Sequence, residues 1–418
     1  MTEDVQWLVG IDWATEKHRV CLLDMSGRVR GERDVNHEGA GLSEVCSWLL
    51  ERTRALSGQI AVAIETPHGP IVEIFLERGF QVYAINPKQL DRFRDRFTVA
   101  GAKDDSRDAH VLGDALRTDR HAFRRLAAED PVVIELREWS RMTDDLRQER
   151  NRLANRVRQQ LRRYYPQAMQ VTDDVAADWF LDLWQEAPTP AKAARIKHTT
   201  IDRILKANRI RRIEAIEVLR ILRQKPLWVA PGTTEAACAH IRTVAARIRL
   251  INQQIKEANH KLNELCAKLE APAEGPPGQK CEQRDIAILR SSPGIGRIVL
   301  ATLLAEAAEP LRQRDYHVLR ALSGIAPVTR RSGKQHFVVR RYACNRRLQN
   351  AVYHWARVAT QHDLISRRRY AELRSRGHTH SRALRGVGDR LLYVACTLLE
   401  RQTPFDPNYK GSQAIGAP

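Results

Sequence analysis

The stretch VQWLVGIDWATEKHRVCLLDMSGRVRGERDVN, residues 5–36, decides the fold of the N-terminal part of the chain. It contains three strand-like runs separated by short turn segments, at residues 5–11, 19–25 and 28–35. Runs spaced so closely leave room only for tight turns, and strands joined by tight turns pair antiparallel. The sequence therefore predicts a sheet that begins with three antiparallel strands.

Helices and strands alternate after these hairpins. The apolar patterns predict a helix, a strand, a helix, a strand and a helix at residues 41–55, 59–64, 72–76, 81–85 and 106–116. Three hairpin strands followed by this alternation is the element order of the ribonuclease H fold. We therefore predict an α/β domain of that fold over residues 1–125.

The rest of the chain is predicted to be mainly helical and to fall into two parts. Residues 130–270 form a helical region with a basic insert, and residues 281–408 form a second, mainly α-helical domain. The segment APAEGPPG breaks the helix between them, so residues 271–280 are predicted to be a linker. Residues 409–418 are a tail.

A heptad-like seam runs through the end of the first helical region. Its apolar residues alternate spacings of three and four: Ile241, Val244, Ile248, Ile251, Ile255, Ala258, Leu262, Leu265 and Leu269. A seam sustained over about three to four heptads predicts a coiled coil, and a coiled coil between chains would make the protein a homo-oligomer, a dimer or a tetramer. A long helix packed within its own domain is the alternative.

The composition points to a polyanionic partner. The 418 residues include 69 Lys and Arg against 50 Asp and Glu, a net charge of +19, and 43% of them are hydrophobic, which excludes wholesale disorder. No apolar run reaches the roughly 18 residues needed to span a bilayer, and the start of the chain lacks a signal pattern. Seven cysteines without a C-x-x-C pair argue against a disulfide framework or a zinc ribbon. We expect a cytoplasmic protein that handles nucleic acid and has no membrane partner.

Four acidic residues are candidate metal ligands. Asp12 ends the first predicted strand and Glu65 directly follows a later one, while Asp105 and Asp108 share one face of a helix. Four converging carboxylates would repel one another unless divalent cations held them, and oxygen ligands suit Mg²⁺ or Mn²⁺. Acids that merely cap helices are the alternative. Asp104 also shares a face with Asp108, which leaves the inner ligand open between Asp104 and Asp105.

The C-terminal domain carries candidate contacts to phosphate. Between residues 330 and 390 the only acids are Asp363, Glu372 and Asp389, whereas arginine is abundant and binds phosphate well. The segment LRSSPGIG, residues 289–296, resembles the turn of a helix-hairpin-helix, which contacts phosphate through backbone N–H groups, although it is also an ordinary helix connection. The candidate contacts are Gly294, Gly296, Arg330, Arg331, Lys334, Arg340 and Arg341. Ser332, among these cations, could be a nucleophile toward a phosphodiester. Composition alone favours an ordinary loop serine, because no histidine base is adjacent in the sequence.

Two sets of motifs resemble one protein family. The first set is similar to the DEDD domain of IS110-family transposases: Ile11-Asp12, IETPHG at 64–69, Ile85-Asn86-Pro87 and KDDSRDA at 103–109. The second set is similar to the C-terminal transposase domain of that family: SPGIG at 292–296, residues 301–305, LSGIAP at 322–327, Ser332-Gly333 and Pro404-Phe405-Asp406. The stretch at residues 166–237 matches no motif.

This resemblance implies a RuvC-like domain in which Asp12, Glu65, Asp105 and Asp108 bind Mg²⁺. It also implies a catalytic serine, Ser332, and a noncoding bridge RNA that pairs with target and donor DNA. Many members of the family have Thr at the position of Asp104. In the family, the serine and the acids of different subunits build one composite site.

The predicted function is therefore an RNA-guided DNA recombinase that moves an insertion element through a phosphoserine intermediate. A metal-dependent junction resolvase, in which Ser332 is idle, is the first alternative. A non-catalytic nucleic-acid-binding protein is the second. Covalent protein–DNA adducts distinguish the recombinase from the resolvase, and metal-dependent cleavage distinguishes both from a binding protein.

Overall fold

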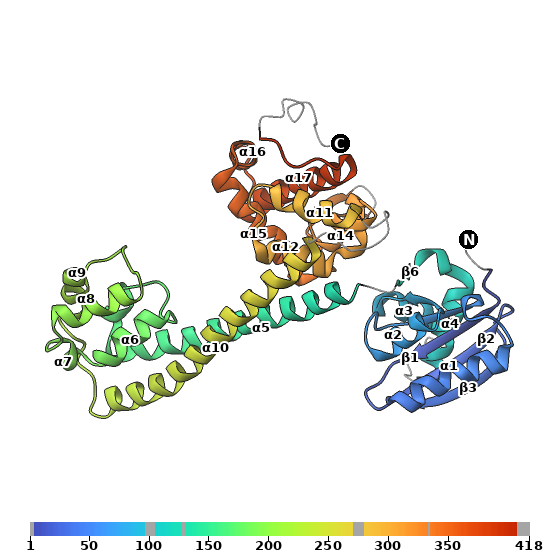
Figure 1. Cartoon of the computed structure of the whole chain (residues 1–418), viewed down its shortest axis with the longest axis horizontal. Helices are drawn as coiled ribbons and strands as arrows, with labels where there is room; N and C mark the ends of the chain where they lie inside the picture. The colour runs from blue at the N-terminus through green and yellow to red at the C-terminus, as the bar shows by residue number, and fades with distance from the viewer. Residues whose placement is uncertain (1–3, 97–104, 128–129, 271–279, 333–334, 408–418) are drawn as a thin grey trace. The chain divides into compact units, whose positions relative to one another are not determined.

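The computed structural model describes residues 4–96, 105–127, 130–270, 280–332 and 335–407 (Figure 1). The chain forms two compact units, Met1–Asp130 and Pro131–Pro418. The first unit is mixed α/β, and the second consists of long helices followed by a mainly helical C-terminal region. The predicted fold class is therefore confirmed.

The first unit is built on a six-stranded sheet with the strand order β3-β2-β1-β4-β5-β6. Its strands are β1 (Trp7–Asp12), β2 (Lys17–Asp24), β3 (Val29–Asn36), β4 (Ile60–Ile64), β5 (Gln81–Ala84) and β6 (Arg124–Arg125). The first three pair antiparallel as predicted, β4 and β5 continue the sheet parallel to β1, and β6 closes the edge antiparallel. Within this sheet, the short edge strand β6 is the one strand that the sequence pattern did not predict.

Helices cover both faces of this sheet. They are α1 (Gly39–Thr53), α2 (Pro70–Glu77), α3 (Pro87–Arg94) and α4 (Asp105–Asp119), with short 3-10 turns at Ser57–Gln59 and Arg120–Ala122. Alternate residues of β1 point to opposite faces: Val9 packs in the core beneath α1 and α2, and Leu8 in the core beneath α4. The two cores hold the sheet between two helical layers.

Two long helices, α5 (Pro131–Tyr164) and α10 (Thr233–Glu270), lie side by side in the second unit (Figure 1). Between them in the sequence come a 3-10 turn (Pro166–Gln170), α6 (Asp178–Glu186), α7 (Pro190–Ala193), α8 (His198–Ala207) and α9 (Ala215–Leu222). These short helices pack on one end of the α5–α10 pair around a core that includes Trp184 and Ile248.

The seam predicted for residues 241–269 is buried inside its own chain. Its first part, Ile241 to Ile251, packs in the core shared with α5 and the short helices, and Leu262 and Leu265 pack against Leu136 of α5. The periodicity thus predicted the helix correctly. Its partner in this structure is α5, which is the internal packing that we gave as the alternative.

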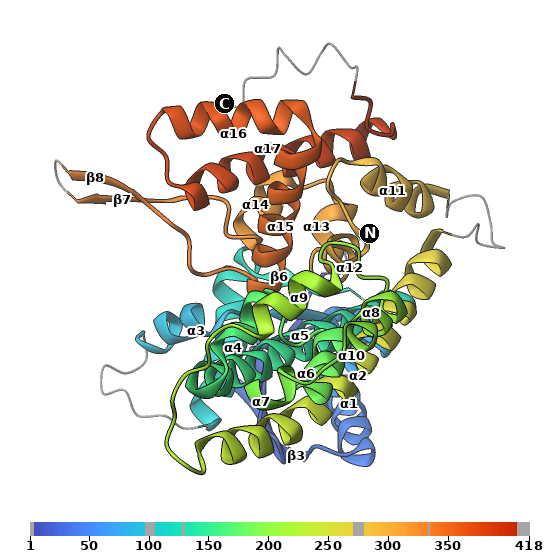
Figure 2. The ribbon, with the colours of Figure 1, turned by 90° about the vertical axis from the view of Figure 1, so that its left-hand side faces the viewer.

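The C-terminal region packs around Trp355, which is fully buried. Its elements are α11 (Lys280–Ser291), α12 (Arg297–Glu306), α13 (Ala308–Arg312), α14 (Tyr316–Leu322), β7 (Val328–Ser332), β8 (Gln335–Val339), α15 (Arg346–His362), α16 (Leu364–Ser375) and α17 (His380–Arg401). Figure 2 shows the β7–β8 hairpin extending away from these helices. Within the described residues, no helix has the length and apolar character needed to cross a bilayer.

Candidate active site

The strand register brings Asp12 and Glu65 together. β1 and β4 are parallel neighbours in which Ile11 pairs with Ile64, so the next residue of each strand, Asp12 and Glu65, lies at the same edge of the sheet. Both residues are half-buried. Two of the four predicted carboxylates are therefore neighbours by backbone geometry alone.

Glycine in β1 lets α4 lie directly on the strand. A Cβ atom on Gly10 would lie 1.8 Å from the carbonyl oxygen of Ala109 and 2.6 Å from the nitrogen of Gly113. Only a residue without a side chain fits in such a contact. Because Gly113 approaches Leu23, which pairs with Leu8, the helix runs back along β1 and its first turn lies toward Asp12. The first turn of α4 contains Asp105 and Asp108.

Asp108 is buried and ion-paired. Its carboxylate accepts hydrogen bonds from Nε and Nη2 of Arg94, at 2.7 and 2.9 Å, and the side chain of Arg94 also pairs with Asp91 at 3.1 Å. This bidentate pair joins the end of α3 to the first turn of α4. Sequence reasoning missed Arg94, because no spacing rule relates it to Asp108.

The structure describes only part of the remaining acidic set. The side chain of Asp105 and the whole of Asp104 lie outside the described residues, so the choice between them stays open. Within the described part of the chain, no group of three or more His, Cys, Asp or Glu residues could hold a metal ion. The donor chemistry nevertheless fits a hard cation, because Asp12 and Glu65 supply carboxylate oxygens at one edge of the sheet and Asp108 already binds a positive group.

We expect Arg94→Gln to destabilise the protein without metal and to make it respond more strongly to Mg²⁺. The paired side chains of Arg94 and Asp108 are 15% and 8% exposed, and removing the cation leaves a buried carboxylate unpaired, which costs about 3 kcal/mol. Mg²⁺ would then meet no competing guanidinium. Thermal unfolding with and without Mg²⁺ measures both effects.

Arg92→Gln, a change to an exposed arginine of the same helix, is the matched control and should behave as wild type. Equal Mg²⁺-induced shifts in wild type and Arg94→Gln would show that Arg94 does not compete with metal at Asp108.

A histidine pair holds the turn that follows Asp12. The Ala14 N–H donates to Nδ1 of His18 at 3.4 Å, so the proton of the ring is on Nε2, which donates to Nδ1 of His37 at 2.8 Å. Burial, with a smaller effect of His37, lowers the pKa of His18 to about 4. The neutral ring thus fixes the backbone beside a candidate ligand. No sequence pattern indicated this pair.

Ser332 is the last residue of β7, where it pairs with Gln335 of β8 at the tip of the hairpin. The side chains of Ser332 and Arg330, and the whole of Lys334, lie outside the described residues, and Arg331 is exposed. Ser332 therefore belongs to the second unit, whereas the four acids belong to the first.

Two arginines and a glycine with positive φ shape the base of this hairpin. Arg340 donates to Oε1 of Gln349 at 2.9 Å, and Arg341 donates to the carbonyl oxygen of Ala326 at 3.3 Å. Gly324 has φ of +68°, and a Cβ there would lie 2.5 Å from Nε2 of Gln349. The turn at residues 322–327 thus needs glycine for both reasons.

The two glycines of the SPGIG turn have different surroundings. A Cβ on Gly294 would lie 2.7 Å from the nitrogen of Ala359, and Nε1 of Trp355 donates to the carbonyl oxygen of Pro293 at 2.9 Å, so this part of the turn is packed on α15. Gly296 is exposed and precedes the first residue of α12, and a Cβ there would meet no atom within 4 Å. Of the two, Gly296 has room for a ligand.

Comparison with known proteins decides the family. A profile described as transposase, of the DEDD type of IS110 elements, matches residues 9–166, and one described as transposase of the IS116/IS110/IS902 family matches residues 286–371. The mini-circle putative transposase for IS117 of Streptomyces coelicolor is 33% identical over 407 residues, which cover 95% of this chain and 94% of that protein. The chain belongs to the IS110 family of transposases.

Two further relatives support this assignment. The putative transposase y4uE of Sinorhizobium fredii is 55% identical over 236 residues, 56% of this chain and 64% of that protein. The 43.6 kDa protein of insertion element IS110 from Streptomyces coelicolor is 25% identical over 425 residues, 100% of this chain and 99% of that protein. This IS110-family transposase is thus a DNA-cleaving and DNA-joining enzyme with a DEDD domain, a type that uses divalent metal ions.

Proposed function

We propose that this IS110-family transposase cuts and rejoins DNA through Ser332, guided by a bridge RNA that pairs with target and donor DNA. The Ser332 hydroxyl oxygen attacks a DNA phosphorus and forms a phosphoserine ester. The P–O3′ bond breaks, and the serine proton passes to the leaving 3′ oxygen. A 3′-hydroxyl of the exchanged strand then attacks the ester, which restores a phosphodiester and frees Ser332 without hydrolysis.

The carboxylates Asp12, Glu65, Asp105 and Asp108 would hold Mg²⁺, or Mn²⁺, at the edge of the sheet. When bound, the metal would polarise the phosphate and neutralise charge that develops on it. Two features of the chain support this placement. The register of β1 with β4 aligns Asp12 with Glu65, and Gly10 allows the first turn of α4 to approach them. The alignment of Asp12 with Glu65 at one edge of the sheet is the observation that supports the proposal.

Partners follow from charge and from the packing of the long helices. A net charge of +19 suits a protein that contacts the backbones of both RNA and DNA while base pairing reads the sequence. We propose a homo-oligomer, dimer or tetramer, so that Ser332 of one subunit acts with the acids of another. Because α5 covers the α10 seam, the contact between subunits would use outward faces of this helix pair. The site of action would be the bacterial cytoplasm, at the nucleoid.

We expect Asp12→Asn to abolish strand exchange and most of the stabilisation by Mg²⁺. Losing a metal ligand removes several kcal/mol of transition-state stabilisation, a loss of about a thousandfold in rate. The same change relieves repulsion between carboxylates, so stability without metal should hold or rise slightly. Strand exchange and thermal unfolding with and without Mg²⁺ measure the two effects.

Glu51→Gln, at an exposed acid of α1, provides the control and should match wild type in both assays. If Asp12→Asn gained as much stability from Mg²⁺ as wild type does, the carboxylate edge would not be the metal site.

A further inference from the structure

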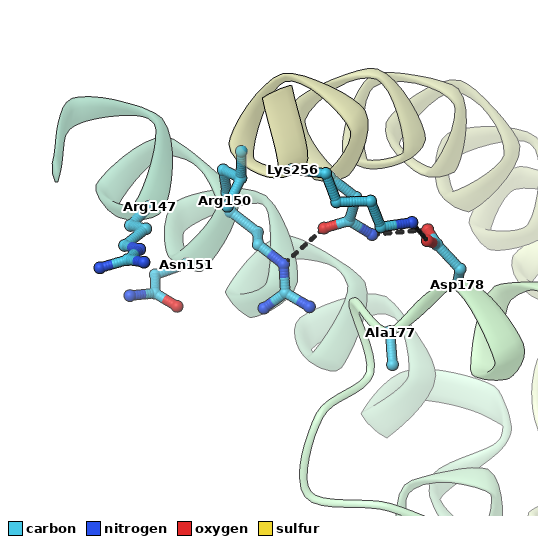
Figure 3. Close-up of a pocket in the computed structure, with 8 residues that line it drawn as sticks. Arg147, Arg150, Asn151, Ala177, Asp178 and Lys256 are labelled. Carbon is cyan, nitrogen blue, oxygen red and sulfur yellow. Dashed lines mark hydrogen bonds and ion pairs between the residues drawn. The ribbon is translucent and has the colours of Figure 1, made fainter. Parts of the chain in front are cut away.

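A pocket of about 510 Å³ lies between α5, α10 and the start of α6 (Figure 3). Three cations line it: Arg147, Arg150 and Lys256. Arg150 donates to Oδ1 of Asn252 at 2.6 Å and pairs with Asp174 at 2.7 Å, and Lys256 pairs with Asp178 at 2.9 Å. Two of the three cations are therefore neutralised by acids of the same chain.

Arg147 differs from the other two. Figure 3 shows it at the end of the pocket away from Asp178. It donates to Oδ1 of Asn259 at 3.3 Å, and the described residues provide no carboxylate within ion-pair distance of it. The nearest acid on its own helix, Asp144, lies one turn away and is 3.7 Å from Arg347. Burial lowers the pKa of the Arg147 guanidinium, and the Asp144 carboxylate opposes part of this shift.

The packing of α5 brings Arg147 to the start of α12. Ser140 lies 3.5 Å from Thr302, and Nε of Arg137 donates to the carbonyl oxygen of Ala305 at 2.8 Å. These contacts show that the two helices run antiparallel, so the next two turns of α5 lead back to Arg297, the first residue of α12. Arg297 is close enough to lower the pKa of Arg147 further.

The helix α15 adds two more basic side chains, His354 and Arg357. Arg347 at the start of α15 pairs with Asp145 of α5 at 3.0 Å, which aligns the two helices. Further along α15, Arg147 and Arg357 both lower the pKa of His354, after burial. Arg297 and Arg357 are exposed and form no ion pair with a described carboxylate. Basic groups of α5, α12 and α15 thus gather at this junction. Its acids, Asp144 and Asp145, pair with Arg347, and no described carboxylate forms an ion pair with Arg147.

An anion would remove the cost of this arrangement. Cations held close together repel, and such clusters persist where a ligand of opposite charge binds. The planar guanidinium matches the oxygens of a phosphate. The start of α12 adds backbone N–H groups, because Gly296 offers no side chain to cap them and leaves space above them.

We propose that Arg147, Arg297 and Arg357 form a phosphate-binding site for the backbone of a nucleic acid where α5, α12 and α15 meet. The ligand is a phosphodiester group of RNA or DNA. This inference deepens the proposed function, on which it rests, by assigning a backbone contact outside the carboxylate edge and the serine hairpin. Arg147 is the central residue, because it alone of the three is half-buried and lines the pocket.

The test compares binding of Arg147→Gln, Arg147→Lys and wild type. Fluorescence anisotropy over a salt series measures the Kd for a labelled structured RNA and, separately, for a DNA duplex of similar length. Arg147→Gln should bind about tenfold more weakly and lower the slope of log K against log salt by about 1. Arg147→Lys should keep the slope but bind more weakly than wild type, because lysine keeps the charge and lacks the paired N–H donors of the guanidinium.

Arg152→Gln is the matched control, an exposed arginine of α5 with no role in the cluster, and should lose less affinity. If Arg147→Gln loses affinity for RNA alone, for DNA alone or for both, the result supports the site and identifies which nucleic acid supplies the phosphate. An unchanged slope for both polymers, or an equal loss in Arg152→Gln, would overturn it.

Thermal unfolding separates binding from structure. Removing Arg147 relieves the cost of burying its charge and the repulsion with Arg297, which together outweigh the attraction to Asp144. Arg147→Gln should therefore melt at or above the temperature of wild type. A clear fall would show that Arg147 has a structural role and would contradict the proposal. If binding were unchanged while the covalent adduct on Ser332 still formed, this site would be wrong and the proposed function would stand.

Discussion

Ser332→Ala is expected to form no covalent protein–DNA adduct and to lose strand exchange completely, while it keeps RNA and DNA binding. The phosphoserine mechanism requires the hydroxyl oxygen of Ser332, because this oxygen forms the bond to phosphorus. Ser332 is the last residue of β7, where it pairs with Gln335 of β8. Denaturing electrophoresis of labelled DNA after incubation with enzyme, guide RNA and Mg²⁺ measures the adduct, and anisotropy measures binding.

The structure identifies a control residue and two alternative nucleophiles for this experiment. Thr329→Ala removes an exposed hydroxyl from the same strand and should leave the adduct unchanged. Ser292 and Ser323 are 4% and 0% exposed, so neither can reach DNA without rearrangement of the core. Mass spectrometry should therefore place the adduct on the peptide that contains Ser332. Undiminished cleavage by Ser332→Ala would instead favour a resolvase that uses metal-activated water.

The parts of the fold that depend on local pattern were predictable from sequence. The strand predicted at residues 59–64 is β4 (Ile60–Ile64), and the strand predicted at 81–85 is β5 (Gln81–Ala84). Apolar periodicity also identified α10 correctly. It could not identify the partner of α10, because a seam of apolar residues packs equally well against α5 or against a second chain.

The residues of the candidate site also fall into two groups: those that a local or topological rule predicts, and those whose contacts depend on tertiary packing. The adjacency of Asp12 and Glu65 could be predicted because strand ends meet at one edge of a sheet, which is a rule of topology. Arg94 was not found, since its contact with Asp108 depends on where α3 ends in space. Gly10 carried an unused signal: a glycine inside a buried strand often marks the close approach of another backbone.

The second large effect is expected from a substitution of Gly10. Gly10→Ala should destabilise the first unit by about 2 kcal/mol, because backbone atoms of α4 occupy the space of the new methyl group and cannot move independently. Displacing α4 also moves Asp108 away from Asp12, so strand exchange and stabilisation by Mg²⁺ should fall together. Thermal unfolding with and without Mg²⁺, alongside strand exchange, measures all three quantities.

Two other glycines of the same unit calibrate the effect. A Cβ on Gly113 would meet the end of the flexible Leu23 side chain at 2.8 Å and the backbone nitrogen of Gly10 only at 3.2 Å, so Gly113→Ala should lose less stability. Gly39→Ala meets no atom within 4 Å and should be neutral or slightly stabilising. The expected order of destabilisation is Gly10, Gly113, Gly39. If Gly10→Ala kept its stability and its response to Mg²⁺, direct contact between α4 and β1 would not be what positions the carboxylates, and the geometric basis of the proposed metal site would fail.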